Sequence, residues 1–243
     1  MGERKMEKKY IFAIDGGTQS TKVVIFDFNG KIISQGKQTL RPAQAPKVGY
    51  VEHPDDDLWD SLISASKLAL DDFSGKVEEI AGIGLCTIRS CRVLLRRDGS
   101  LAYPVIDWMD TRAYGPFVFP VDDVAYATTT TGYMTHKLTG EFRDTMANCT
   151  NRQWPADMEA WDWSKDEDDY RKLNLRREMM MKPQMPGSIL GELTEEAARS
   201  LGLVKGIPVV ATASDKAVEA LGAGLAQSGN TGLVSLGTYI TSM

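Results

Sequence analysis

Two apolar runs near the start of the chain are separated by a short polar turn. Tyr10 to Ile14 and Lys22 to Phe28 are rich in aromatic and β-branched residues, which favour extended strands. The turn between them, Gly16 to Thr21, holds two glycines, a glutamine and three hydroxyl side chains. Asp15 precedes this turn and Lys22 follows it. The chain is therefore predicted to open as a tight β-hairpin whose tip carries an acid, a base and many hydrogen-bond donors.

The residue types of this turn support two interpretations. In the first, the glycines only serve the geometry of the hairpin. In the second, the turn binds phosphate, because glycines let backbone N–H groups approach an anion and hydroxyl groups add donors. The candidate phosphate-binding residues are then Gly16, Gly17, Thr18, Gln19, Ser20 and Lys22. Asp15 is a candidate magnesium ligand, because Mg²⁺ binds carboxylates while it retains several waters.

Composition narrows the class of protein. The 243 residues are 42% hydrophobic and 25% charged, which is ordinary for a globular chain long enough to bury a core. A net charge of −5 argues against nucleic acid as a partner, and no apolar stretch approaches the length of a membrane-spanning helix. Three cysteines without paired spacing and two distant histidines argue against a metal cage or a histidine-based triad. We therefore expect a cytoplasmic protein that binds neither nucleic acid nor a membrane.

The rest of the chain alternates between strand and helix patterns. Lys31 to Leu40 follows an Asn-Gly turn and completes a three-stranded meander. Apolar residues spaced by three and four predict a helix from Leu58 to Phe73, after a proline and three aspartates. Further strands are expected over Ile80–Cys86, Arg92–Arg97 and Val209–Thr212, and further helices over Val124–Leu138, Asp168–Met181, Thr194–Leu201 and Lys216–Ala226. This order predicts an α/β fold.

Three segments resemble motifs of one protein family and occur in that family's order. Asp15 to Lys22 resembles the first phosphate motif of the sugar kinase, actin and Hsp70 superfamily. Trp108, Asp110 and Arg112 match the Trp-x-Asp-x-Arg signature of FGGY-type carbohydrate kinases, and "ATASDKAVEALG" resembles the segment that holds their catalytic aspartate. The resemblance implies a ribonuclease H-like, actin-type ATPase domain with a mixed five-stranded sheet flanked by helices. It also implies ATP and Mg²⁺ as cofactors.

The resemblance assigns the catalytic base to Asp215. Phosphorylation of an alcohol needs a carboxylate that orients the hydroxyl and accepts its proton, and a strand-to-helix turn after "PVVAT" holds such a side chain rigidly. Together with Asp15, Asp215 is also a candidate metal ligand. The alternative is that Ser214 and Asp215 only cap the helix that follows.

The substrate contacts implied by the resemblance are Arg89, Ser90, Trp108, Asp110 and Lys216. Arg89 offers a planar set of donors to a polyhydroxylated ligand, and Trp108 could stack on a sugar or serve as a buried structural residue. Asp110 either contacts substrate or pairs with Arg112. Lys216 could bind a hydroxyl or an acidic sugar, or could lower the pKa of Asp215.

The end of the chain resembles the start of a second domain. FGGY kinases have two related domains that enclose ATP and sugar. The resemblance places a sugar-binding, catalytic-base domain at residues 8–228 and the truncated start of an ATP-binding domain at 229–243, with a second phosphate motif at Gly237 and Thr238. The expected partners are a sugar or polyol and either a missing C-terminal half or a second copy in a homodimer.

The function implied by the resemblance is ATP-dependent phosphorylation of a sugar or polyol hydroxyl. In this interpretation the chain is the N-terminal half of a carbohydrate kinase and is inactive alone. The alternative is a non-catalytic sugar- or nucleotide-binding module of the same fold.

Overall fold

The three-stranded meander predicted at the N-terminus is present. A computed structural model describes residues 7–225, 232–236 and 240–242. The antiparallel strands of the meander are β1 (Tyr10–Gly16), β2 (Ser20–Asp27) and β3 (Ile32–Thr39). Asp15 pairs with Lys22 in the register of β1 and β2, and the Gly17 N–H donates to the Ser20 carbonyl oxygen at 3.0 Å. The polar turn is therefore the tip of two long paired strands.

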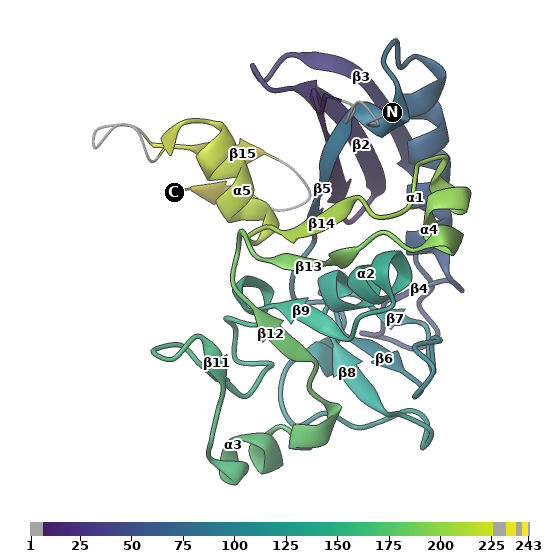
Figure 1. Ribbon diagram of the computed structural model, residues 1–243. Helices are drawn as coiled ribbons and strands as arrows, with labels where there is room; N and C mark the ends of the chain where they lie inside the picture. The colour runs from purple at the N-terminus through teal and green to yellow at the C-terminus, as the bar shows by residue number, and fades with distance from the viewer. Residues whose placement is uncertain (1–6, 226–231, 237–239, 243) are drawn as a thin grey trace.

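The meander is one half of a larger mixed sheet (Figure 1). The remaining strands are β5 (Ile80–Thr87), β14 (Pro208–Ala211) and β13 (Ile189–Glu192). β5 lies parallel to β1, β14 lies parallel to β5, and β13 closes the edge antiparallel to β14, which gives the order β13-β14-β5-β1-β2-β3. The mixed α/β sheet is confirmed, with a sixth strand beyond the five that were expected. That strand, β13, is short, contains Gly191 and has an irregular register, so its sequence carries little strand pattern.

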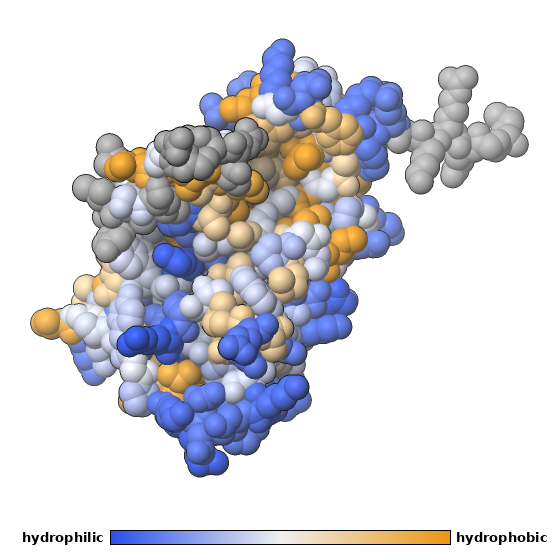
Figure 2. Space-filling model, turned by 90° about the vertical axis from the view of Figure 1, so that its left-hand side faces the viewer, coloured by the Kyte–Doolittle hydropathy of each residue, from blue (hydrophilic) through white to orange (hydrophobic). Residues whose placement is uncertain are grey.

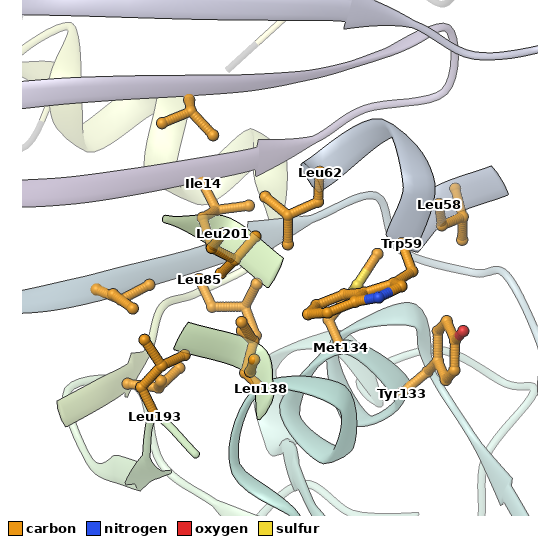
Figure 3. Close-up of a cluster of buried hydrophobic side chains, with 14 of the residues drawn as sticks. Ile14, Leu58, Trp59, Leu62, Leu85, Tyr133, Met134, Leu138, Leu193 and Leu201 are labelled. Atoms are coloured by element: carbon orange, nitrogen blue, oxygen red, sulfur yellow. The ribbon is translucent and has the colours of Figure 1, made fainter. Parts of the chain in front are cut away.

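Helices cover one face of this sheet and form the main core with it. They are α1 (Asp57–Asp71), α2 (Thr130–Thr139) and α4 (Glu195–Leu201). Alternate residues of β1, such as Phe12 and Ile14, are buried toward these helices, while Ile11 and Asp15 lie on the opposite face. In Figure 3, leucines of α1, α2 and α4 and the ring of Trp59 gather around Ile14 and Leu85 of the sheet. The core therefore anchors the strands whose ends carry the polar tip.

A second apolar cluster lies below the sheet, among short paired strands. These strands are β4 (Glu52–His53), β6 (Val93–Leu95), β7 (Val105–Ile106), β8 (Tyr126–Thr128), β9 (Arg143–Thr145), β10 (Ala156–Asp157), β11 (Asp162–Trp163) and β12 (Lys182–Gln184). Phe117, Met146 and Trp154 are among the buried residues of this cluster. The helix α3 (Glu167–Lys172) lies at the lower end, where Figure 2 shows a concentration of hydrophilic residues.

Two predicted helices are partly wrong. The stretch Val124–Leu138 begins as β8, which pairs with β6, and the helix α2 starts only after the Thr129 hydroxyl caps the N–H groups of Thr131 and Gly132. The stretch Asp168–Met181 contains the short helix α3 and a separate 3₁₀ turn at Arg177–Met179. In both places tertiary pairing or a capping side chain overrides the local helical pattern.

The chain ends in a helix and a hairpin. The helix α5 (Asp215–Gly222) is followed by β15 (Val234–Leu236) and β16 (Ile240–Ser242), which pair antiparallel. The helix predicted over Lys216–Ala226 is shorter than expected, because α5 ends at Gly222. The predicted second phosphate motif, Gly237 and Thr238, lies outside the described residues. Within the described ranges, no helix is long and apolar enough to cross a bilayer.

Gly36 of β3 provides a test of the packing between the sheet and α1. A Cβ atom there would overlap the Ala65 carbonyl oxygen and lie 2.5 Å from the Ala69 amide nitrogen. Because both atoms belong to the helix backbone, Gly36→Ala is expected to lower the free energy of unfolding by about 1–3 kcal/mol, as measured by urea denaturation. The matched control is Gly82→Ala in β5, where the added Cβ meets the Pro208 carbonyl oxygen at an ordinary 3.5 Å. Equal stability of the two variants would contradict this packing.

Candidate active site

The carboxyl ends of three parallel strands bring the predicted catalytic residues to one edge of the sheet. Asp15 lies near the end of β1, beside Cys86 of β5, and β14 ends at Ala211, shortly before Asp215. In parallel α/β sheets this edge is the common position of ligand sites. The register of the sheet therefore places the hairpin tip and Asp215 together.

Asp15 and Asp215 are close enough for their charges to interact. The pKa of Asp15 is raised, first because its carboxylate loses hydration and then because Asp215 is negatively charged, while Lys22 opposes the shift. The same two aspartates help to raise the pKa of the Cys86 thiol to about 12, although burial is the larger cause. Two carboxylates whose charges interact offer oxygen ligands of the kind that a divalent cation such as Mg²⁺ prefers. The Asp15–Asp215 pair therefore suits the Mg²⁺ that was expected here.

Asp215 begins the helix α5, and its environment argues against a purely capping role. Ser214 occupies the N-cap position but makes no side-chain capping hydrogen bond. One carboxylate oxygen of Asp215, Oδ1, is buried and has no hydrogen-bond partner among the described residues. A buried acceptor without a partner is costly in a folded protein. This oxygen is thus available to a ligand hydroxyl or to a metal ion.

Trp108 connects the Trp-x-Asp-x-Arg signature to the hairpin tip. Its indole Nε1–H donates to Thr18 Oγ1 at 3.1 Å, across 90 residues of sequence. The ring is half-buried and packs against the main core. The structure therefore brings together two of the segments that were singled out in the sequence.

Asp110 lies in a buried ion-pair cluster. Its side chain is fully buried and accepts hydrogen bonds from the Val51 N–H (2.6 Å) and from the Arg112 guanidinium (2.7 Å). Arg112 also binds Glu52 at 2.6 Å and stacks on Tyr50. Because the oxygens of Asp110 already have partners, the geometry favours the alternative in which it pairs with Arg112. In that role it positions the loop that carries Trp108.

The loop after β5 holds Arg89 and Ser90. Arg89 is exposed and makes no ion pair within the part of the chain that the structure describes. Ser90 has a positive φ of 68° and its Oγ accepts a hydrogen bond from Asn151 Nδ2 at 3.0 Å. A positive φ is uncommon for serine, which marks this loop as a place where the backbone is strained. Asn151 was not singled out from the sequence, because it lies far from Ser90 along the chain.

Lys216 is held by groups on both sides of the domain boundary that was expected. Its Nζ donates to Glu219 at 2.9 Å and to Ser235 Oγ of β15 at 2.7 Å, and Ser235 in turn donates to Glu219 at 2.9 Å. These bonds tie the helix that begins with Asp215 to the hairpin at the end of the chain. These hydrogen bonds do not test the expected contact of Lys216 with the substrate, which stays a prediction.

A buried set of possible metal ligands lies behind Trp108. The donor atoms of His53, Cys91 and Asp107 lie within 4.8 Å of one another, and all three side chains are buried. Asp107 is already bonded to His53 Nε2 at 2.9 Å and accepts the Met109 N–H at 2.8 Å. Burial and the nearby Asp107 raise the pKa of the Cys91 thiol well above its usual value. A structural role in holding the Trp108 loop accounts for these contacts.

The geometry agrees with the family comparison. Residues 10–117 and 121–222 match the model of the FGGY family of carbohydrate kinases, N-terminal domain. The chain is 50% identical over 238 residues to the uncharacterised sugar kinase YgcE of Escherichia coli (strain K12), which covers 98% of this chain and 48% of that protein. It is 37% identical over 105 residues to a glycerol kinase of Agrobacterium fabrum (strain C58), over 43% of this chain and 21% of that one.

Solved structures confirm the fold. Plasmodium falciparum glycerol kinase with ADP superposes with a TM-score of 0.75 at 18% identity, over 97% of this chain and 54% of that chain. Ligand-bound xylulose kinase from Lactobacillus acidophilus gives a TM-score of 0.73 at 19% identity, over 89% and 50% of the two chains. The chain thus spans about half the length of these kinases.

The raised pKa of Asp15 leads to a pH-dependent prediction. A carboxyl whose pKa is higher in the folded than in the unfolded state costs stability once the pH rises above its unfolded value of about 4. Asp15→Asn is therefore expected to unfold at higher urea concentration than the wild type at pH 7, with the difference shrinking toward pH 4. Asp122→Asn, which removes one charge from an exposed loop, is the control. A variant that is less stable than wild type at pH 7 would show that Asp15 instead stabilises the fold.

Proposed function

The chain belongs to the FGGY family of carbohydrate kinases, and we propose that it supplies the sugar-binding lobe and the general base of an ATP-dependent kinase. The reaction transfers the γ-phosphoryl group of ATP to a hydroxyl of a sugar or polyol. The observation that carries this proposal is the electrostatic interaction of Asp15 with Asp215 at the carboxyl ends of the strands, together with a buried Asp215 oxygen that has no partner among the described residues.

Asp215 receives the proton of the substrate hydroxyl. In phosphoryl transfer through a loose transition state, the proton leaves late, so the orientation of the alcohol matters more than the strength of the base. A carboxylate fixed at the first turn of α5, next to a buried strand, provides that orientation. Its Oδ1 atom has no competing hydrogen bond among the described residues.

The hairpin tip binds the phosphates. The backbone N–H groups at Gly16 and Gly17 and the hydroxyls of Thr18 and Ser20 are donors for phosphate oxygens, and Lys22 lies opposite Asp15 to offset phosphate charge. When bound, Mg²⁺ supplies charge neutralisation to the transferred group. Asp15 and Asp215 are the residues that would hold it.

The loops beside Asp215 bind the sugar. Trp108 presents an indole ring held by Thr18, and aromatic rings of this kind stack on the apolar face of a sugar. Arg89 and Ser90 lie in the loop that follows β5. Residues 8–228 then form the sugar-binding domain, and residues 229–243 begin the ATP-binding domain, with Lys216 and Ser235 joined across this boundary.

The role of Asp215 can be tested in a chimera. This chain is joined to the C-terminal half of the 50% identical Escherichia coli protein, and ADP release is followed with ATP, Mg²⁺ and a panel of ketoses, aldoses, polyols and sugar acids. Asp215→Asn is expected to lower kcat by roughly 10²-fold or more, the scale of general-base loss, with little change in the affinity for the acceptor sugar.

The control for this test keeps the chimera and changes an exposed aspartate. Asp122→Asn is expected to leave kcat unchanged, because Asp122 lies on an exposed loop outside the site. Normal turnover by Asp215→Asn would remove Asp215 from the role of base. Failure of the unsubstituted chimera to release ADP with every acceptor would contradict the kinase proposal itself.

A further inference from the structure

Among the residues that the structure describes, the buried cation Arg92 has no partner of opposite charge. It is only 2% exposed, and within the described residues it forms no ion pair. The guanidinium lies between two aromatic rings, with its Cζ 4.4 Å from the ring centre of Phe117 and 4.8 Å from that of Trp154. Its Nη2 donates to the Gln153 carbonyl oxygen at 2.8 Å, while Nε and Nη1 have no partner in the described part of the chain. Burial of such a charge without compensation is unfavourable by several kcal/mol.

The neighbours of Arg92 carry further unpartnered donors. Gln153 and Trp154 are each 4% exposed, and over the described ranges neither Gln153 Nε2 nor Trp154 Nε1 has a hydrogen-bond partner. Together with Nε and Nη1 of Arg92, they make four buried donors without partners among the described residues, on three residues that contact one another. Native proteins leave few buried polar groups unpaired, so a concentration of donors alone indicates a missing acceptor. The acceptor that matches a guanidinium and neutral N–H groups is an anion.

This donor cluster lies beside the predicted sugar loop. Arg92 follows Ser90 by two residues, and Gln153 follows Asn151, whose amide donates to Ser90 Oγ at 3.0 Å. The Asn151 side chain also accepts the Gln153 N–H at 3.0 Å. The Ser90 loop and residues 151–154 are therefore linked by hydrogen bonds, and Arg92 is bonded to the second of these segments.

We infer that Arg92, Gln153 and Trp154 bind the carboxylate of an acidic sugar, so that the substrate class is a sugar acid rather than a neutral sugar or polyol. This inference rests on the proposed kinase function and names its substrate. A carboxylate carries one negative charge and neutralises the one buried cation, whereas a phosphate dianion would leave a net charge buried. Its two oxygens also match the planar geometry of the guanidinium.

The test measures binding to the 243-residue chain without ATP, so that it does not depend on turnover. The probes are D-gluconate, D-galactonate, D-xylonate and D-glucuronate, each paired with a neutral partner: D-glucitol, galactitol, xylitol and D-glucose. At least one acid is expected to bind roughly tenfold or more tightly than its neutral partner, as a charge-assisted hydrogen bond provides. Calorimetry gives the affinities and thermal unfolding gives a second readout.

Three variants test whether the preference for the acid depends on this cluster. Arg92→Met keeps the apolar contact with Phe117 and Trp154 and is expected to abolish the preference for the acid. Because it removes an uncompensated buried charge, it should fold at least as stably as wild type. Trp154→Phe removes one donor and should weaken the preference severalfold. Arg97→Met removes the same charge from an exposed position of the same segment and should leave the preference intact.

Each contrary outcome would contradict either the carboxylate site or the kinase proposal. If no acid in the panel binds better than its neutral partner, or if the preference survives Arg92→Met, the assignment of the carboxylate site is wrong. Inorganic phosphate that binds as tightly as the acids, with the same dependence on Arg92, would also overturn it, because the cluster would then be a general anion site. Turnover of a neutral sugar by the chimera would leave the kinase proposal standing without this one. Acid binding without turnover of any acceptor would support the carboxylate site and contradict the kinase proposal.

Discussion

The parallel pairing of β1 with β5 is the constraint on which the whole site depends. This pairing puts Asp15 next to Cys86, so that the loop carrying Ser90 starts beside the hairpin tip. On the other side of β5, β14 ends shortly before Asp215. Because side chains alternate between the faces of a strand, a slip of one residue in β1 would turn Asp15 into the main core and Ile14 into solvent. The apolar core on one face therefore fixes the carboxylates on the other.

The elements that could be predicted from the sequence are those whose pattern is local. The meander β1–β3 and the helix α1 have a clear periodicity and clear turn residues, and both are present. The stretch around Val124 was mispredicted because its structure depends on distant partners: Tyr126–Thr128 is a strand only through its pairing with Val93–Leu95. The strand β13 was missed because it is short, contains Gly191 and pairs in an irregular register. Short pairings between remote segments leave little trace in the pattern of either segment.

The site residues divide in the same way, into those that lie in a local motif and those whose role depends on distant contacts. Asp15, Trp108 and Asp215 stood out because each lies in a compact motif, and the bond between Trp108 and Thr18 brings two of these motifs together. Asp110 also belongs to such a motif, yet only the structure shows that its carboxylate accepts hydrogen bonds from Val51 and Arg112. The cluster around Arg92 had no motif at all. Its significance lies in the burial of a charge, which depends on residues about sixty positions away.

The charges of the site would orient an acidic substrate. At the hairpin end, the charges of two aspartates interact, and an approaching carboxylate would be repelled unless a cation lay between them. Behind the sugar loop, the buried charge of Arg92 attracts the same carboxylate, with a strength that is larger away from water. A molecule with a carboxylate at one end and hydroxyls along its length would therefore turn its hydroxyls toward Asp215. In that orientation, the carboxylate of the substrate provides its affinity and also determines which hydroxyl lies at Asp215.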